Sequence, residues 1–516
     1  MLFNSYEFIF YFLPIVLLGF HLIGDQGHHR VAIAWLVGMS LFFYGWWNPA
    51  YLGLILMSIF FNYGIGISLG STLGGLQKKT VLIFGVVVNL GLLTYFKYAN
   101  FFIDSLNALT NTNLIFYEVI LPLAISFFTF QQIAYLVDTY RGETKEYNFL
   151  HYCLFVTFFP QLIAGPIVHH KEMLPQFAKN VVYKIRSKNI AIGFSIFVLG
   201  LFKKVVLADG VSVYATPVFD AAEAGMVLTF FEAWGGAFAY TFQLYFDFSG
   251  YSDMALGIAR MFGIYLPLNF NSPYKATSII DFWKRWHITL SRFLKDYLYI
   301  PLGGSRKGKT RRYVNLMITM VLGGLWHGAG WTFVLWGALH GFYLIINHGW
   351  TSIFKNKVKT KWGSSFAWII TFFAIVISWV PFRATSIEGA NNMLVSMLGG
   401  NGISVSSFFI GNLGRAETWL VANGLIFDGF FANNIFSDMY TGLVWILILF
   451  LISIVFPNTQ QIIGLYDPSS KPDFSKVQQH WIKWKITREW AIFTAILFVI
   501  SVISLTKGSE FLYFQF

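Results

Sequence analysis

Apolar runs long enough to cross a lipid bilayer recur from one end of the chain to the other. A membrane-spanning helix needs roughly 17 to 25 mostly apolar residues. Of the 516 residues, 56% are hydrophobic and only 12% are charged, against a usual charged share of about 25%. The sequence therefore predicts an all-α polytopic membrane protein rather than a soluble enzyme with an anchor. The clearest runs are 7–23, 31–47, 50–70, 80–98, 115–138, 189–208, 226–246, 365–382, 440–456 and 489–505.

The net charge of +12 could indicate nucleic-acid binding, but its distribution indicates membrane topology instead. Lys and Arg concentrate in a few loops between apolar runs, which is typical of cytoplasmic segments. We therefore expect no nucleic-acid partner. The first run carries Glu7 where a signal peptide is basic, so we expect a retained helix. Cys153 is the only cysteine, which excludes a disulfide framework. Cys153 is expected to be a small apolar residue within a helix. The alternative is a thiol that carries an acyl group.

Placing the basic loops in the cytoplasm gives a consistent membrane topology. Arg30 and Lys78 then lie in the cytoplasm, and the N-terminus lies outside. Residues 151–168 lie between two basic loops, so this stretch, broken by prolines and glycine, is predicted to enter the membrane and return. The acidic segment 209–225 is placed outside, as is the lysine-free segment 383–440. This topology also requires residues 313–347 to form a hairpin with both ends in the cytoplasm.

That hairpin contains His327 in VLGGLWHGAGWTFVLWG, with no charged residue near it. Its first arm, 313–325, is about 13 residues or about 20 Å long, which is short of a hydrocarbon core of about 30 Å. His327 is therefore predicted at the apex of two half-helices within the membrane. An ionisable side chain in an apolar segment is costly, so it indicates a functional site. The alternative is a core histidine bonded to a carbonyl.

A second histidine, His287, lies in DFWKRWHITLSRFLKDYLYIPLGG. Winding residues 281–298 as a helix gathers the aromatic and leucine side chains on one stripe and the basic ones opposite. We expect an interfacial helix in the cytoplasmic leaflet. His287 would lie at the margin of the apolar stripe, near Trp283 and Leu294, facing a cavity.

Other polar motifs have simpler explanations. GGSRKGKT at 303–310 has the spacing of a P-loop but lacks the preceding strand, so an NTPase is not expected. Its basic residues could attract the phosphates of a coenzyme. Asp247 and Asp253 are predicted either to pair with the basic region 275–312 or to act in the site. No zinc is expected, since no His-x-x-Glu-His motif or cysteine cluster is present. The remaining histidines are expected to lie at helix ends and in loops, where water contacts their polar tips. They include His21, His28, His29, His169, His170 and His340.

At this point the motifs resemble a known family. RWHITLSRFLKDYLYIPLGG followed by GGLWHGAGWTFVLWGALHG is similar to the signature of the membrane-bound O-acyltransferase (MBOAT) family. His327 stands at the near-diagnostic histidine and His287 at the second polar position. FPQLIAGPIV, QLYFDFSGYSDMALG and NFNSPY extend the likeness to the bacterial alginate O-acetylation (AlgI-type) branch.

The resemblance implies a fold of about 10–12 transmembrane helices, with re-entrant and interfacial helices around a central cavity. It implies a single membrane-embedded acyltransferase domain over 1–516, with core motifs in 115–347 and an extracytoplasmic loop at 383–440. The implied activity moves acetyl groups from acetyl-CoA in the cytoplasm across the bacterial inner membrane to an exported polysaccharide, most simply alginate. An extracytoplasmic SGNH-hydrolase-like acetyltransferase is the implied partner, and no permanently bound cofactor or metal is implied.

Acyl transfer to a hydroxyl needs a base and a group that stabilises the oxyanion. We expect His327 to be the base and His287 to orient the donor or to assist from the cytoplasmic side. The residues expected to contact the donor are Lys284, Arg285, Trp286, Asn271, Asp296 and Trp326. D-alanyl or peptidoglycan O-acyl transfer on the same fold is an alternative. So is a non-catalytic transporter or scaffold, since broken half-helices are typical of transporters.

Overall fold

The computed structural model describes residues 1–71, 74–115, 119–146, 148–354, 360–405, 415–422, 424–429, 439–466, 469, 481–505 and 512. Helices form nearly all of the secondary structure in these segments. The exception is a pair of two-residue parallel strands, β1 (Ile403–Ser404) and β2 (Leu425–Ile426). The prediction of an all-α polytopic protein is confirmed. The loop lysines at 355, 357 and 359 lie outside the described residues, as does most of the terminal SEFLYFQF motif.

The N-terminal half is built from short and long helices separated by tight turns. In order, they are η1 (Glu7–Phe12), α1 (Leu13–Asp25), α2 (His29–Gly45), α3 (Ala50–Gly70), α4 (Gly75–Leu93), η2 (Thr94–Tyr98), α5 (Ala99–Thr110), α6 (Ile125–Tyr140), α7 (Phe149–Thr157), α8 (Phe159–Leu162), α9 (His170–Phe177), η3 (Asn180–Tyr183), α10 (Ser187–Phe202) and η4 (Lys203–Ala208).

The C-terminal half continues with one very long helix and several hairpins. These are α11 (Asp209–Glu223), α12 (Phe230–Met261), η5 (Pro273–Lys275), α13 (Ile279–Trp283), α14 (Ile288–Leu294), η6 (Lys295–Tyr299), α15 (Lys309–His327), α16 (Trp331–Ile353), α17 (Lys361–Arg383), α18 (Ile387–Met397), α19 (Arg415–Ala422), α20 (Met439–Val455), α21 (Thr459–Ile462), η8 (Gly464–Tyr466) and α22 (Arg488–Ser504).

Each expected apolar run coincides with helix, although several boundaries are wrong. Helix continues past 98 to Thr110, past 208 through the predicted outside loop to Glu223, and past 246 to Met261. Within the described segments, five helical runs are long and apolar enough to cross a membrane: Glu7–Asp25, Ala50–Gly70, Gly75–Thr110, Ser187–Glu223 and Lys361–Arg383. The run expected at 115–138 starts too early, because helix α6 begins only at Ile125. Pro122 disfavours helix in the residue before it, and Ala124 has a positive φ of 60°.

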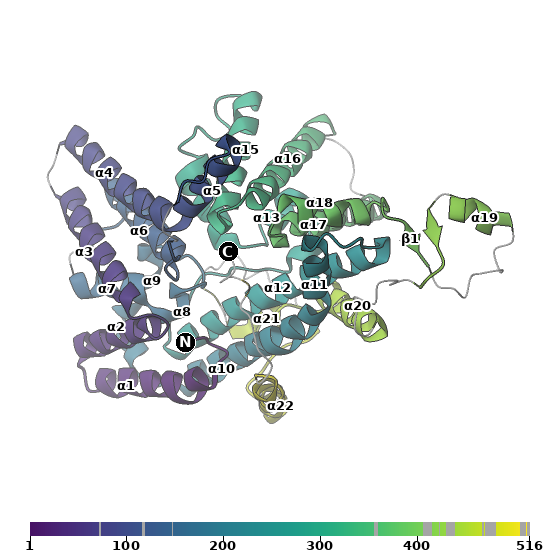
Figure 1. Cartoon of the computed structure of the whole chain (residues 1–516). Helices are drawn as coiled ribbons and strands as arrows, with labels where there is room; N and C mark the ends of the chain where they lie inside the picture. Colours follow the sequence, from purple (N-terminus) through teal and green to yellow (C-terminus); the bar gives the residue numbers. More distant parts are fainter. Residues whose placement is uncertain are drawn as a thin grey trace.

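Helix α12 is shared by two hydrophobic cores. Its C-terminal part, from Tyr251, packs with α1–α4 and α6–α10 in the first core, and its N-terminal part, up to Phe248, packs with α11, α16 and α17 in the second. Figure 1 shows this arrangement, with α1–α9 on the left, α12 in the centre and α16–α18 at the upper right. The boundary between the two cores therefore crosses the middle of the molecule.

Two glycine pairs allow α10 and α12 to touch along their backbones. A Cβ added at Gly257 would lie 2.5 Å from the Gly193 carbonyl oxygen, and one at Gly250 would lie 2.7 Å from the Gly200 carbonyl oxygen. Such close contact through small residues is how helices associate where lipid removes the hydrophobic driving force.

We expect Gly257→Val to destabilise the fold, because the backbone oxygen that its side chain would meet cannot move aside. Overpacking of this kind costs about 1–3 kcal/mol. The thermal unfolding temperature of the detergent-solubilised protein measures the effect. Gly91→Val in α4 is the control, since a Cβ at Gly91 meets nothing within 4 Å. Equal unfolding temperatures for the two variants would contradict this account.

The predicted break within 151–168 is present. Helix α7 ends at Thr157, Phe158 interrupts it with a ψ of 104°, and α9 begins only at His170. Every residue from 152 to 170 is buried. Non-helical backbone is tolerated at membrane depth only when protein or a wet cavity surrounds it. Here protein surrounds it, and the Ile167 N–H donates to Thr289 Oγ1 at 3.0 Å.

Candidate active site

His327 is the last residue of α15, where the α15–α16 hairpin turns. The two arms approach closely because a Cβ at Gly337 would lie 2.5 Å from the Met320 carbonyl oxygen. The expected arm length is wrong. Helix α15 has 19 residues and is therefore about 28 Å long, because it already begins at Lys309. Arm length alone therefore gives no argument for a re-entrant turn.

The carbonyl end of α15 is capped by side chains from η2. The last four carbonyls of a helix lack partners within it. Lys97 Nζ donates to the carbonyl oxygens of Trp326 (2.5 Å) and His327 (2.9 Å), and Tyr98 Oη donates to that of Leu325 (2.8 Å). The Gly328 N–H donates to the fourth, on Gly324. The segment that carries His327 is thus held at every terminal carbonyl.

His287 lies in a sharp turn rather than in a continuous helix. The expected interfacial helix over 281–298 is wrong, because α13 ends at Trp283 and α14 begins at Ile288. His287 has a left-handed backbone conformation, with φ of 41°, and its side chain is 0% exposed. It is therefore inside the protein and not at the margin of a surface stripe. A non-glycine residue in this conformation persists only where tertiary contacts hold it.

Asn269 determines which nitrogen of His287 carries the proton. Asn269 Oδ1 accepts from Thr289 N (3.3 Å) and Thr289 Oγ1 (3.0 Å), and it lies 3.1 Å from His287 Nδ1. Because an amide oxygen only accepts, Nδ1 must donate, and Nε2 keeps its lone pair. Nε2 is buried and has no hydrogen-bond partner among the residues that the structure describes. His287 therefore presents an unused acceptor.

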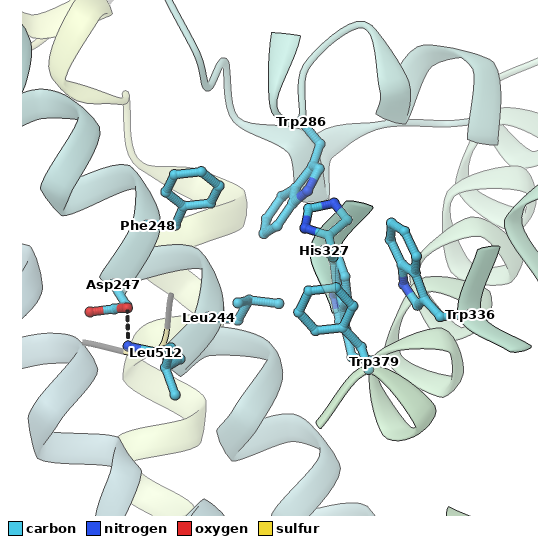
Figure 2. A pocket seen from close by; sticks show the side chains of 9 residues that line it. Leu244, Asp247, Phe248, Trp286, His327, Trp336, Trp379 and Leu512 are labelled. Carbon is cyan, nitrogen blue, oxygen red and sulfur yellow. Dashed lines mark hydrogen bonds between the residues drawn. The ribbon is translucent and has the colours of Figure 1, made fainter. Parts of the chain in front are cut away.

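The two imidazoles lie next to each other at the boundary of the two cores. Their ring centroids are 6.2 Å apart, and His327 is 5% exposed. A narrow cavity of about 10 Å³ touches His327, which is room for about one water molecule. Its lining residues are Leu244, Asp247, Phe248, Trp286, His327, Trp336, Trp379, Phe382 and Leu512. Figure 2 shows the His327 ring between Trp286 and Trp336.

Asp247 faces the same cavity but pairs with a different basic region from the one expected. Its Oδ1 lies 2.8 Å from Lys204 Nζ, and Asp253 Oδ2 lies 2.7 Å from Lys203 Nζ. The expectation that both acids pair with 275–312 is therefore wrong. The π-helix η4 turns both lysines toward α12. Asp247 Oδ2 also accepts from the Leu512 N–H at 3.3 Å, as the dashed line in Figure 2 shows.

A second, larger cavity is lined by Trp326, the residue before His327. It measures about 200 Å³ and contains one ammonium group, that of Lys97, among mainly apolar walls. The rest of its lining comes from Trp47, Tyr51, residues 120–127, Ile163 and Trp326. In the topology predicted by the positive-inside rule, residues 47–51 and 120–124 connect helices on the outer side of the membrane. We call this space the outer cavity.

The structure brings together only part of the residues predicted to contact the donor. Trp286 and Trp326 lie beside the histidines. The other four lie at the periphery. Arg285 pairs with Asp281, Asn271 bonds to Asn458, Asp296 lies near Lys295, and Lys284 is exposed.

Three residues of the site were missed by the sequence analysis. Lys97 and Asn269 contact the site through hydrogen bonds to residues distant in the sequence, which no local motif predicts. His340 is fully buried, its ring centroid lies 4.7 Å from that of Trp336 in a tilted arrangement, and it bonds to Ser378. The i, i+4 spacing of Trp336 and His340 on α16 is the signal that could have identified it.

The expectation that the other histidines are wetted is wrong for several of them. His21 lies near the Tyr183 and Met261 carbonyls, at 3.3 and 3.4 Å. His169 lies 3.3 Å from Asp138, and His170 lies 3.3 Å from Glu146. Each is buried because it has a polar partner inside the protein. His28 is exposed, as expected.

The remaining motifs take ordinary positions. The GGSRKGKT segment follows the π-helix η6 rather than a strand, and Arg306, Lys307, Lys309 and Arg311 are exposed. Cys153 is buried in the first core. In the part of the chain that the structure describes, no group of three or more His, Cys, Asp or Glu side chains could hold a metal ion.

Comparison with known proteins gives consistent family and enzyme assignments. The profile of the membrane-bound O-acyltransferase family matches residues 51–387. The chain is 47% identical to a Helicobacter pylori protein named peptidoglycan O-acetyltransferase, covering 78% of this chain and 81% of that protein. It is 41% identical to the probable alginate O-acetylase AlgI of Pseudomonas aeruginosa, covering 81% and 78%. It is 28% identical to the teichoic acid D-alanyltransferase of Streptococcus thermophilus, covering 50% and 68%.

These matches agree with the buried histidine pair and the apolar helical scaffold. They favour an enzyme over the transporter interpretation, because the relatives are named as acyl-transferring enzymes. The protein is a multi-pass O-acyltransferase of the bacterial inner membrane. The chain belongs to the membrane-bound O-acyltransferase family.

Proposed function

We propose that this enzyme moves acetyl groups from acetyl-CoA, bound at the cytoplasmic face, to a hydroxyl on the outer side, for O-acetylation of an exported polysaccharide. The observation that carries the proposal is the pair of buried imidazoles, His287 and His327, 6.2 Å apart between the two cores. A neutral imidazole is the usual base for deprotonating a hydroxyl.

The chemistry balances with these two side chains. The acceptor oxygen attacks the thioester carbonyl carbon while its proton passes to His327. The tetrahedral intermediate then collapses, the C–S bond breaks, and the coenzyme thiolate takes the proton back from the imidazolium. The unused Nε2 acceptor of His287 can accept a hydrogen bond from a second hydroxyl of the acceptor sugar and so orient the acceptor. Orientation of this kind supplies a large part of the rate in bimolecular reactions.

The placement of charge supports opposite routes for the two substrates. Helix α15 begins in an exposed basic segment and ends at His327 beside the outer cavity. A coenzyme has phosphates that basic loops attract, whereas the outer cavity contains mainly apolar and aromatic surface. The donor would approach from the start of α15 and the acceptor from its end. Because the cavity at His327 holds about one water, acetyl binding requires its walls to move.

We expect neutralising the basic segment to weaken donor binding. The variant Arg306→Gln/Lys307→Gln/Lys309→Gln/Arg311→Gln should raise the KM for acetyl-CoA about tenfold, equivalent to about 1.4 kcal/mol, with kcat little changed. The wild-type KM should itself rise with salt, because screening weakens exposed charges. Lys361→Gln, at the exposed first residue of α17, is the control. A KM equal to the wild-type value would contradict donor binding at this loop.

The polysaccharide is proposed from the relatives. The peptidoglycan relative shares 47% identity with this chain and the alginate relative 41%. Peptidoglycan is therefore the first candidate acceptor. Alginate, which the resemblance of the sequence motifs to the AlgI-type branch led us to expect, is the second. We further propose that an extracytoplasmic SGNH-hydrolase-like acetyltransferase completes the transfer to the glycan.

Deleting the gene and measuring ester-linked acetate tests the assignment. We expect the acetate released by mild base from isolated peptidoglycan to fall to background, and complementation with the wild-type gene to restore it. The same measurement on the secreted polysaccharide separates the two acceptors. Unchanged ester acetate in both polymers would refute polysaccharide O-acetylation.

A further inference from the structure

Lys97 is a buried lysine whose ammonium contacts no carboxylate. Its side chain is 9% exposed, and within the described segments no carboxylate oxygen lies within 4 Å of Nζ. The other buried lysine of the core, Lys204, is paired with Asp209 and Asp247. A buried cation without a counter-charge is costly unless polar groups compensate it. Such an arrangement indicates a function.

The compensation comes from the backbone that carries His327. The ammonium donates to the carbonyl oxygens of Trp326 and His327, the last two residues of α15. A helix has partial negative charge at its carbonyl end, so a cation there is favourable. Lysine can reach this end because the π-helix η2 shifts the side chains of 94–98 relative to regular α-helix. The contact joins segments 230 residues apart.

Lys97 also lines the outer cavity together with Trp326. An ammonium has three N–H groups, and two of them are used by the α15 carbonyls. Lys97 thus lies between the proposed acceptor route and the backbone of the proposed base. The ammonium is connected to the residue that carries the imidazole through the backbone carbonyl of His327.

We propose that Lys97 is a positioning residue for acyl transfer: its ammonium fixes the carbonyl end of α15 and so sets the place of the His327 imidazole, next to Trp326 in the wall of the outer cavity. This inference rests on the proposed role of His327. A positioning role of Lys97 can be distinguished from a purely structural one. A residue that only stabilises the fold changes the amount of folded enzyme and not the turnover of each folded molecule.

The test compares Lys97→Met, Lys97→Arg and Tyr98→Phe as purified, detergent-solubilised proteins. Turnover of acetyl-CoA is normalised to the folded fraction from gel filtration. For Lys97→Met we expect kcat to fall about 100-fold, the cost of a misplacement of about 1 Å, with the KM for acetyl-CoA unchanged. Lys97→Arg keeps the charge and should recover most of the loss. Tyr98→Phe removes one neutral bond to Leu325 and should stay within about threefold of wild type.

If Lys97→Met does not fold, Lys97→Gln replaces it, since an amide still donates to the carbonyls but has no charge. We expect an intermediate kcat for Lys97→Gln. A wild-type kcat in Lys97→Met or in Lys97→Gln would overturn the proposal, and so would a fall in Tyr98→Phe as large as that in Lys97→Met. His327→Ala separates the two hypotheses. If it is inactive while Lys97→Met is fully active, only the role of Lys97 fails, whereas an active His327→Ala refutes the base itself.

Discussion

His327→Ala is expected to lower the rate of acetyl transfer at least 100-fold, the lower end of what a general base contributes, which is about 10²–10⁴. The substitution removes the imidazole at the end of α15 and leaves the hairpin intact, because Lys97 and Tyr98 bond to backbone carbonyls rather than to the ring. The KM for acetyl-CoA should stay near the wild-type value, since the basic donor segment lies at the other end of α15. Turnover of labelled acetyl-CoA by the solubilised enzyme measures both constants.

The matched control is His21→Gln. His21 is also a buried histidine, but it lies in the first core against the carbonyls of Tyr183 and Met261. A glutamine amide can donate to the same carbonyls, so activity per folded molecule should be retained. If His327→Ala retained wild-type turnover, or if both variants lost activity equally, the histidine at the hairpin would not be the base.

The second large effect is expected from Asn269→Leu, at about 10- to 100-fold in kcat. Outer groups that orient a functional imidazole have effects of this size in metal sites. Asn269 Oδ1 holds the proton on His287 Nδ1 and accepts two bonds from Thr289. Leucine is similar in volume but cannot accept. His287 would then lose its fixed tautomer and its left-handed turn would lose its support.

Asn271→Leu is the control for this prediction. Asn271 lies two residues away in the same NFNSPY motif and bonds to Asn458 instead of to His287. Its kcat should stay within about threefold of wild type, the effect of one modest hydrogen bond. Kinetics of both variants, normalised to folded protein, give the comparison. Equal losses in the two variants would show that the Asn269–His287 contact has no special role.

The apolar runs predicted the helices well because lipid-facing and core-facing residues are both hydrophobic, so composition alone identifies a span. The same property hides which side chains face the site. His327 was identified because an imidazole is conspicuous in VLGGLWHGAGWTF. Helix ends were less accurate, as at Ile125 and Lys309, because turns depend on single residues such as Ala124 with positive φ.

The surroundings of the histidines could not be predicted because they are tertiary. His287 adopts a turn that the amphipathic pattern of 281–298 contradicts, and a hydrogen bond from its Nδ1 to Asn269 Oδ1, 18 residues earlier, holds it there. Helical periodicity placed His287 at a surface margin, whereas it is fully buried. The NFNSPY motif places Asn269 and Asn271 two residues apart, and only Asn269 contacts His287. Lys97 appeared only as a charge near the end of an apolar run.

Turnover of labelled acetyl-CoA by the purified enzyme tests most directly whether this chain performs chemistry through His327. The account predicts release of the coenzyme thiol, with the acetyl group passed to a hydroxyl or to water, at a rate that depends on His327. Binding of acetyl-CoA without thiol release, or equal release by the wild type and His327→Ala, would contradict it.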